Sequence, residues 1–408
     1  MSSPAKLPGL SAASSKRWLA GWGVPLVCAI VAMLVTMLTQ FASRMADGFH
    51  PSLLLAVPDG IPLADYIRSV DPNFRFVNVF DAYDGRYLWT MAVDPVARGE
   101  AHDLIDLAAY RYGHPLYSWI AMILSFGQVK ALPGVFWLMS ITSMGLAALL
   151  SSRLLDRLGA SPWWGLLVAC SPGMLFSATM ALTEPAQVAI VAGLLLLWLD
   201  ERRSSWLIGG TVVAMSLLKE QLILVAFALG LTLIIEWFKT RQWDWGRCAA
   251  LFAAPIGLGM WMVYVRGQFS AEQKHYDDGN LGRPVTGWLE TLDIASQLRN
   301  GDSASSQIGS IVAPVLLATA LLILFAALIG VRRADPLGMI VVCQAVLIST
   351  LGWRTLLYPH EMLRIPSLAV ALAVMLLIAH FSRTNRTPSA ADIDGAGGQL
   401  ESQDPTSA

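Results

Sequence analysis

Charged side chains are scarce in this chain of 408 residues, of which 14% are charged and 55% are hydrophobic. Soluble globular domains carry about 25% charged residues, so this composition argues against a water-solvated domain and predicts one solvated mostly by lipid. The formal net charge is −1, and no basic stretch is interleaved with aromatic residues. The sequence therefore gives no sign of a nucleic-acid partner.

Cysteine is also rare, with four residues and no CxxC pair. All four fall within or at the edge of apolar segments, at Cys28, Cys170, Cys248 and Cys343. This placement is typical of small hydrophobic side chains that face lipid or a neighbouring helix. It predicts no disulfide framework.

Histidines are too scattered to form a metal-binding motif, since His114, His275 and His360 lie far apart in the chain. Asp277 and Asp278, close to His275, could bind a divalent cation, but such a group is more typical of a solvated loop. We therefore expect no metal site and no cofactor, with a divalent cation as the alternative.

Long apolar runs such as 24–41, 308–331 and 367–381 approach or reach the roughly 20 residues that a spanning helix needs. The chain is therefore expected to be an all-α polytopic membrane protein with about ten transmembrane helices in one domain, 21–385. The expected spans are 21–41, 132–152, 161–181, 185–200, 205–218, 221–237, 248–265, 307–331, 336–352 and 363–381. The first run is interpreted as a retained helix, because it is longer than a signal-peptide core and no cleavage site follows it.

Two kinds of polar break alternate between the apolar runs. One kind is basic, at Lys16-Arg17, Arg153 with Arg157, Arg202-Arg203, Lys239 with Arg241 and Arg247, Arg332-Arg333, and Arg383 with Arg386. The other mixes acids with His and Arg, at 81–84, 183–185, 219–220 and 358–364. The positive-inside rule places the basic breaks in the cytoplasm. We therefore expect a plasma (inner) membrane protein with cytoplasmic termini, 1–20 and a disordered tail, 386–408.

This orientation leaves two hydrophilic loops outside, at 42–113 and 267–307, and the first is long enough to hold helices of its own. The apolar stretch 115–126 is too short to span and is expected to dip into the membrane or lie at its interface. Segments 185–200 and 205–218 are also short, and we expect them to line a cavity as half-length helices.

The first loop contains the densest cluster of reactive side chains. Asp84, with Asp81 as the competing choice, is flanked by aromatic residues and followed by Gly85. Aromatic walls desolvate a carboxylate and are expected to raise its pKa toward the working pH of a general base, and the same rings would stack on a sugar. The alternative is an ordinary juxtamembrane loop with interfacial Tyr and Trp.

The pattern Tyr83-Asp84-Gly85-Arg86-Tyr87, an Asp-Pro about ten residues later, and Tyr110-Arg111-Tyr112 before Pro115-Leu116 resembles the first-loop signature of C-type (GT-C) membrane glycosyltransferases. It is most similar to bacterial relatives of the GPI mannosyltransferase that adds the second mannose. Leu182-Thr183-Glu184-Pro185 and Leu217-Leu218-Lys219-Glu220-Gln221 resemble two further motifs of that family. The resemblance covers residues 20–240, and in the C-terminal third it extends only to the hydropathy and to Arg364. Arg86 and His114 depart from the family pattern.

The resemblance implies a transferase that uses a polyprenyl-phosphate sugar donor on the extracytoplasmic face, with Asp84 as general base on the acceptor hydroxyl. Cations are needed at the departing phosphate, and the candidates are Arg111, Lys219, Arg354 and Arg364. The full set of candidate substrate-binding residues is Arg86, Tyr87, Tyr110, Arg111, His114, Glu184, Lys219, Glu220, Arg354 and Arg364. Structural alternatives stay open: snorkelling for Arg354 and Arg364, an ion pair for Lys219-Glu220, and a helix-end role for Glu184.

The leading hypothesis is an inverting hexosyltransferase, for mannose or another hexose, with an envelope glycan, lipid or protein as acceptor and membrane lipid around it. A lipid-linked sugar flippase or small-solute transporter is the alternative from another class. Transporters place ionisable groups near the bilayer midplane, whereas here they lie at the outer boundary, and no internal repeat is found. An O-antigen polymerase or ligase would use the same donor, but its large loop comes late in the chain.

Overall fold

The computed structural model describes residues 21–200, 204–269, 280–299 and 303–384. In this part of the chain the regular structure is helical, and the β pairings are isolated bridges, Pro58 with Val77 and Leu281 with Leu351. The expected terminal segments 1–20 and 386–408 and the group around His275 lie outside the described residues. The all-α prediction is thus confirmed for the described ranges.

Within those ranges, six helical segments are long and apolar enough to cross a membrane. They are α2 (Gly23–Ser43), α7 (Leu132–Arg157), α12 (Ile223–Thr240), α13 (Trp245–Gln268), α15 (Ser303–Arg333) and the α18–α19 pair (Pro359–Arg364 and Ser367–Thr384). Shorter apolar helices are α10 (Glu184–Trp198), α11 (Ser205–Leu218) and α16 (Pro336–Ser349). This is the architecture of a membrane-embedded helical protein, while the number of about ten spans stays a prediction.

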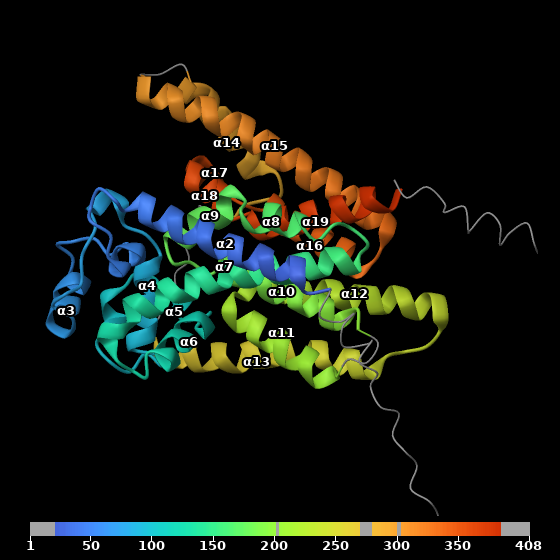
Figure 1. The fold of residues 1–408 in the computed structure, drawn as a ribbon, viewed down its shortest axis with the longest axis horizontal. Coiled ribbons are helices and arrows are strands. Elements are labelled where there is room, and N and C mark those ends of the chain that lie inside the picture. Colours follow the sequence, from blue (N-terminus) through green and yellow to red (C-terminus); the bar gives the residue numbers. More distant parts are fainter. Residues whose placement is uncertain (1–20, 201–203, 270–279, 300–302, 385–408) are drawn as a thin grey trace, which may run out of the picture.

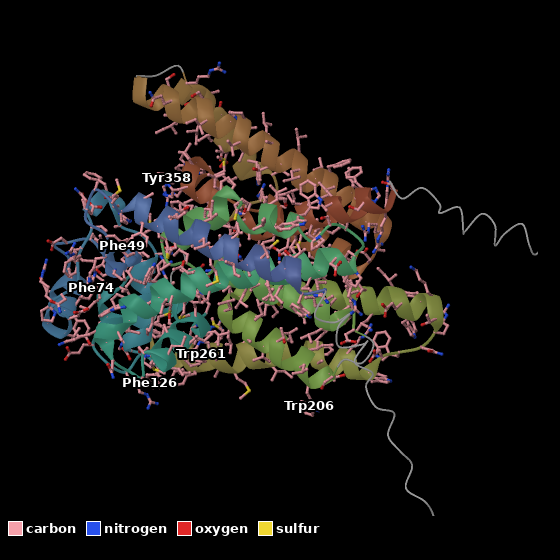
Figure 2. All side chains as sticks on the ribbon, in the orientation of Figure 1. Phe49, Phe74, Phe126, Trp206, Trp261 and Tyr358 are labelled. Carbon is pink, nitrogen blue, oxygen red and sulfur yellow. The ribbon has the colours of Figure 1, made fainter. Side chains whose placement is uncertain are left out.

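Large apolar side chains cover much of the outside of the bundle (Figure 2). Trp206 and Phe126 are both 88% exposed and point away from the other helices. Exposed apolar surface of this kind is unfavourable in water, so we expect these side chains to contact membrane lipid.

One expected span is wrong in detail, because 161–181 is not a single helix. It forms α8 (Trp164–Ala169) and α9 (Pro172–Thr179). Pro172 lacks an N–H, and a residue that precedes proline is pushed out of the helical region. Ser171 accordingly has φ −64° and ψ 151°, which ends one helix and starts the next.

The first loop, 42–113, folds at one end of the bundle (Figure 1). It holds α3 (Pro62–Val70), α4 (Gly85–Val93), α5 (Ala108–Arg111) and the 3-10 turns η1 (Pro51–Leu55), η2 (Val79–Asp81) and η3 (Ala101–Leu104). Its apolar residues, including the fully buried Trp89, join the main core of the bundle. The expectation that this loop contains helices is confirmed.

The stretch 115–126 forms α6 (Leu116–Leu124), followed by the turn η4 (Val129–Ala131). At a rise of about 1.5 Å per residue, such a nine-residue helix is too short to cross a bilayer. The described part of the second loop contributes α14 (Thr286–Arg299), which packs on α15, and α17 (Trp353–Leu357) follows α16.

Basic side chains tie the helices together at the opposite end of the bundle. Arg153 Nη1 donates to Gly21 O at 2.7 Å, Arg157 Nη2 donates to Leu199 O at 2.7 Å, and Arg383 Nε donates to Leu158 O at 3.2 Å. These bonds connect the segment before α2 with the ends of α7, α10 and α19. Arg153, Arg157 and Arg383 therefore lie at the end of the bundle remote from the first loop.

Candidate functional site

Asp84 stands immediately before α4, at the junction of the first loop and the bundle. Gly85 makes this position possible, since a Cβ there would lie 2.8 Å from Leu55 O. The backbone before it is anchored by Tyr83 N–H, which donates to Ala56 O at 3.1 Å. The Asp-Gly pair of the sequence motif thus fixes where the carboxylate is presented.

Arg364 brings three carboxylates of distant origin together. Its Nη1 donates to Asp84 Oδ2 at 2.9 Å, and its Nε lies 3.2 Å from Glu184 Oε1. Nη1 is also 3.6 Å from Glu361 Oε1, one turn earlier in α18. The guanidinium is buried, and burial of so many charges is tolerated only because they compensate one another.

The approach of α18 to α9 places Arg364. A Cβ at Gly173 would lie 2.0 Å from Leu363 O, so only glycine lets the two short helices come this close. The break of 161–181 into α8 and α9 therefore contributes directly to the position of the arginine.

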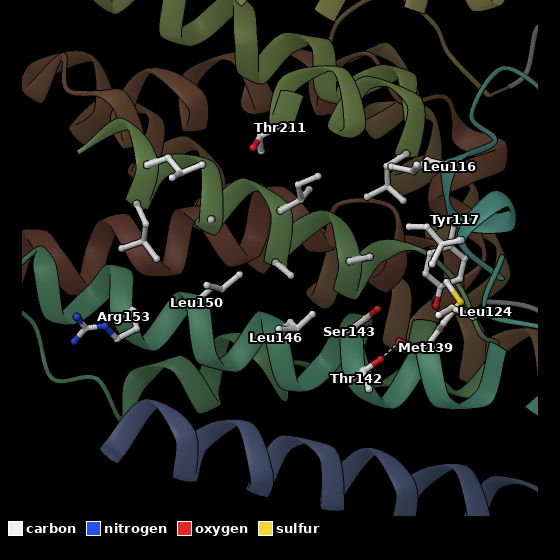
Figure 3. A pocket seen from close by; sticks show the side chains of 18 of the residues that line it. Leu116, Tyr117, Leu124, Met139, Thr142, Ser143, Leu146, Leu150, Arg153 and Thr211 are labelled. Atoms are coloured by element: carbon white, nitrogen blue, oxygen red, sulfur yellow. Dashed lines mark hydrogen bonds between the residues drawn. The ribbon is translucent and has the colours of Figure 1, made fainter. Parts of the chain in front are cut away.

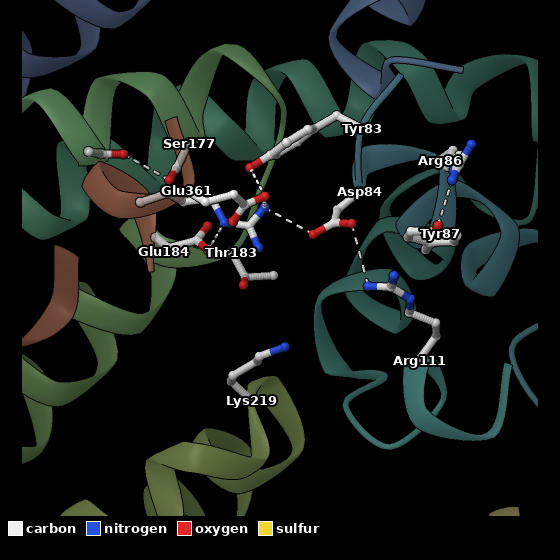
Figure 4. Close-up of polar contacts among 12 residues, drawn as sticks. Tyr83, Asp84, Arg86, Tyr87, Arg111, Ser177, Thr183, Glu184, Lys219 and Glu361 are labelled. Carbon is white, nitrogen blue, oxygen red and sulfur yellow. Dashed lines mark hydrogen bonds and ion pairs between the residues drawn. The ribbon is translucent and has the colours of Figure 1, made fainter. Parts of the chain in front are cut away.

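Arg111 holds the other side of Asp84, with Nη1 3.4 Å from Oδ1 (Figure 4). Its guanidinium lies 3.8 Å from the centre of the Tyr87 ring, a cation–π distance. Arg86 packs on the same ring and donates from Nη2 to Tyr87 Oη at 2.6 Å. Tyr87 therefore serves as a support for two arginines rather than as an exposed stacking surface.

The electrostatic surroundings of Asp84 correct an expectation. Burial alone would raise the pKa of the carboxyl, but Arg364 and Arg111 outweigh it and hold the pKa at about 2. The expected upward shift is wrong, because the sequence did not reveal that two guanidinium groups would reach the same carboxylate. Asp84 is ionised at neutral pH.

Glu184 opens α10 and lies on the cavity side of Arg364. Its Oε1 faces Arg364, while the buried Oε2 has no hydrogen-bond partner among the described residues. Pro185 follows at a position where proline suits a helix start. The carboxylate thus combines a helix-end position with one oxygen that a ligand could use.

Lys219, Glu220 and His114 form a second polar group beside the first. Lys219 ends α11 with an extended backbone, φ −159° and ψ 126°. His114 Nδ1 lies 2.9 Å from Glu220 Oε2, and Lys219 Nζ lies 3.4 Å from His114 Nε2. Burial and the nearby Lys219 lower the pKa of His114, with Glu220 opposing them.

These side chains surround a small polar cavity of about 40 Å³, room for a few water molecules. It is lined by Asp84, Tyr87, Leu88, Met91, Arg111, His114, Leu182, Thr183, Glu184, Lys219 and Arg364. Figure 4 shows Asp84 between Arg111 on one side and Glu184 and Glu361 on the other, with Lys219 facing the same space. The first loop, the Thr-Glu-Pro turn and the Lys-Glu turn therefore meet.

Several predicted residues lie elsewhere. Asp81 is exposed on η2, and Arg354 is exposed on α17 with its guanidinium 5.7 Å from the Trp353 ring. Neither lines the cavity, so Asp84 is the carboxylate of the first loop that the fold selects. Arg86, Tyr110 and Glu220 stand behind the lining residues and contact them.

Two residues of the site were not singled out from the sequence. Glu361 accepts a hydrogen bond from Tyr83 Oη and pairs with Arg364, and the Tyr83 ring lies 5.0 Å from the Arg364 guanidinium. The spacing of Glu361 and Arg364, three residues apart on one helical turn, was the available signal. Among the described residues no group of three or more His, Cys, Asp or Glu is placed to hold a metal ion.

A second pocket is an apolar groove of about 720 Å³. Three of its lining residues, Leu116, Ala186 and Leu218, lie within two residues of His114, Glu184 and Lys219 in the chain. The groove then follows facing sides of α7 and α10 to Arg153 and Arg157 at the basic end (Figure 3). From Met139 to Arg157 this is about 27 Å at the helical rise of 1.5 Å per residue.

Comparison with protein-family models, with curated proteins and with solved structures found no match to this chain. The fold and the site define a membrane-embedded helical protein with a buried acid–arginine cluster and a separate long apolar groove.

Proposed function

We propose that the protein is an integral membrane glycosyltransferase that moves a hexose, mannose or another, from a polyprenyl-phosphate donor to an envelope glycan, lipid or protein. The observation that carries this proposal is a polar cavity and a long apolar groove whose lining residues are near neighbours in the chain at three places. A lipid-linked sugar needs both environments, an apolar channel for its chain and cations with a carboxylate for its reacting end.

In this reaction the acceptor hydroxyl oxygen attacks the anomeric carbon, and the bond from that carbon to the phosphate oxygen breaks. Asp84 takes the hydroxyl proton as general base, and polyprenyl phosphate leaves with the electron pair. Attack opposite the leaving group inverts the configuration of the sugar. Lys219 and Arg111 neutralise the charge that develops on the departing phosphate.

The two arginines that contact Asp84 contribute to its role as general base in different ways. Arg364 is held by three carboxylates, so it stays in place and keeps Asp84 oriented. The Arg111 contact is longer, 3.4 Å, and a phosphate would compete for this guanidinium. Its transfer to phosphate would free Asp84 Oδ1 and raise the low pKa of the carboxyl at the moment when a base is needed.

The proposed setting is the plasma (inner) membrane, with the polar cavity on the extracytoplasmic side. The gathering of the described basic turns at the far end of the bundle supports this orientation through the positive-inside rule. It implies about ten crossings, both termini in the cytoplasm, and extracytoplasmic loops at 42–113 and 267–307.

A lipid-linked sugar flippase is the second candidate, and one feature favours it. The apolar groove follows α7 and α10 from Met139 to Arg157 at the basic end of the bundle, as the chain of a lipid crossing the bilayer would. A flippase requires no proton acceptor, so the two functions differ in their need for Asp84.

The test uses purified protein in nanodiscs with radiolabelled polyprenyl-phosphate hexoses and envelope glycans as acceptors. Sugar transfer that disappears in Asp84→Asn and persists in Arg354→Ala supports a transferase. If both variants instead move the intact lipid across the membrane of liposomes equally well and neither transfers sugar, the protein is a flippase and not a transferase.

A further inference from the structure

His114 has a different charged group at each of its ring nitrogens. Nδ1 lies 2.9 Å from Glu220 Oε2, and Nε2 lies 3.4 Å from Lys219 Nζ. We propose that His114, as a neutral imidazole protonated on Nδ1, is a positioning residue that presents Lys219 to the phosphate of the lipid donor. This inference rests on the proposed function and concerns a residue that departs from the glycosyltransferase pattern.

The tautomer follows from the partners. An ammonium group has donors only, and a carboxylate has acceptors only. Nε2 must therefore accept from Lys219. The single proton of the neutral ring is then on Nδ1, the nitrogen that lies 2.9 Å from Glu220 Oε2. A doubly protonated ring would set a donor against the ammonium and place two cations side by side.

Lys219 is the least compensated of the three cations that line the cavity. Arg364 has three carboxylates around it, and Arg111 lies 3.4 Å from Asp84 and 3.9 Å from Asp106. Among the described residues, Lys219 has one carboxylate partner, Glu220, at the long distance of 4.0 Å. An anion entering the cavity would therefore gain its strongest electrostatic attraction from Lys219.

His114 explains why that ion pair is long. Glu220 Oε2 lies 2.9 Å from Nδ1, whereas Glu220 Oε1 lies 4.0 Å from Lys219 Nζ, so the carboxylate is directed at the ring and not at the ammonium. The flexible lysine stem would otherwise be free to fold onto Glu220. The His114 ring is also stacked edge-on with Tyr110, whose ring centre lies 5.5 Å from Lys219 Nζ, so the ammonium is guided from two sides.

The charged groups that face His114 are Glu220, Lys219 and Arg111, with the Tyr110 ring beside them. Because burial and Lys219 lower its pKa from the usual 6.5, the ring is neutral at neutral pH. Acidification through this lowered pKa would protonate Nε2 and abolish its acceptor. Phosphate binding through Lys219 is thus expected to be constant above pH 6.5 and to fall at more acidic pH, where the lowered pKa of the ring lies.

The test compares two replacements in the full-length protein in nanodiscs. The amide oxygen of His114→Gln reaches the place of Nε2 and can accept from Lys219, whereas the amide N–H of His114→Asn reaches the place of Nδ1 and can donate to Glu220. The probe is undecaprenyl methyl phosphate, a phosphodiester, which lacks the second ionisation near about pH 6 of a phosphate monoester. Undecaprenol, without phosphate, measures binding of the chain alone.

Affinity for the phosphodiester is expected to fall about tenfold or more in His114→Asn, the loss of a charge-assisted contact, and to stay within about threefold in His114→Gln. Wild-type affinity is expected to stay constant from about pH 8 to about pH 6.5 and to decline toward about pH 5, and Lys219→Met is expected to remove this decline. Undecaprenol binding should be unchanged in all variants. The wild-type pH profile serves as the readout if His114→Asn fails to fold.

The inference is overturned if the Asn and Gln variants lose affinity equally, if neither does, or if wild-type affinity is independent of pH. Wild-type protein that binds the phosphodiester no better than undecaprenol overturns the proposed function as well. The two failures are therefore separate results of one experiment.

Discussion

Arg364 Nη1 donates to Asp84 Oδ2 at 2.9 Å across 280 residues of sequence. The contact joins the first loop to the last membrane segment and closes the polar cavity between them. Glu184 and Glu361 share the same guanidinium. The candidate site is therefore assembled from the entire length of the chain around one buried arginine.

Replacing Asp84 by Asn removes the proposed proton acceptor and keeps the size of the side chain. Sugar transfer is expected to fall by about 10²-fold or more, the usual contribution of a general base. Turnover of the purified variant with a polyprenyl-phosphate hexose checks this. Asp81→Asn, on the exposed turn η2, is the matched control and should keep wild-type turnover. Equal losses in both variants would contradict the assignment of the base to Asp84.

Removing the buried arginine should destabilise the protein. In Arg364→Met, the carboxylates of Asp84, Glu184 and Glu361 lose their common cation, and breaking a buried ion pair costs about 3–5 kcal/mol. Thermal unfolding in detergent should show a clear decrease for this variant and none for the exposed Arg354→Ala. Unchanged stability of Arg364→Met would mean that the cluster is not buried as described.

Gly85 is expected to tolerate no side chain. A Cβ would meet Leu55 O at 2.8 Å, so Gly85→Ala should displace the start of α4 and with it Asp84, lowering turnover much more than stability. Gly134→Ala is the control, since a Cβ at Gly134, in helix α7, would have no neighbouring atom within 4 Å. Turnover and unfolding temperature of the two variants should separate the effects, and full activity of Gly85→Ala would contradict the proposed position of the carboxylate.

The pKa of Asp84 predicts an acid-sensitive contribution to stability. Its value of about 2, below the usual 3.8, means that the ionised form is favoured by folding. The stabilisation is complete above the usual value and is lost as the pH falls through 3.8 toward 2. Unfolding temperatures between about pH 6 and about pH 3 should fall more steeply for wild type than for Asp84→Asn, and parallel curves would exclude a paired Asp84.

The short motifs of the sequence predicted part of this site because their local chemistry is self-contained. The turn at Asp84-Gly85 and the helix start at Glu184-Pro185 are each determined by residues that are neighbours in the sequence. The hydropathy pattern likewise predicted the helical membrane fold, although Pro172 broke one expected span.

Other features depend on contacts that no local pattern contains. Arg354 and Arg364 are both arginines on short helices at a membrane boundary, and only packing of α18 against Gly173 decides which one is buried. The low pKa of Asp84 required two arginines from separate segments. The spacing of hydrophobic residues in a single sequence does not reveal which distant side chains come into contact.

A cryo-EM structure of the protein with bound polyprenyl phosphate tests the central claim most directly. We expect the phosphate in the cavity, within about 4 Å of the Lys219 ammonium, and the polyprenyl chain in the groove between α7 and α10. Phosphate density at the Arg153 and Arg157 end of the groove, with the Asp84 cavity unchanged, would contradict it.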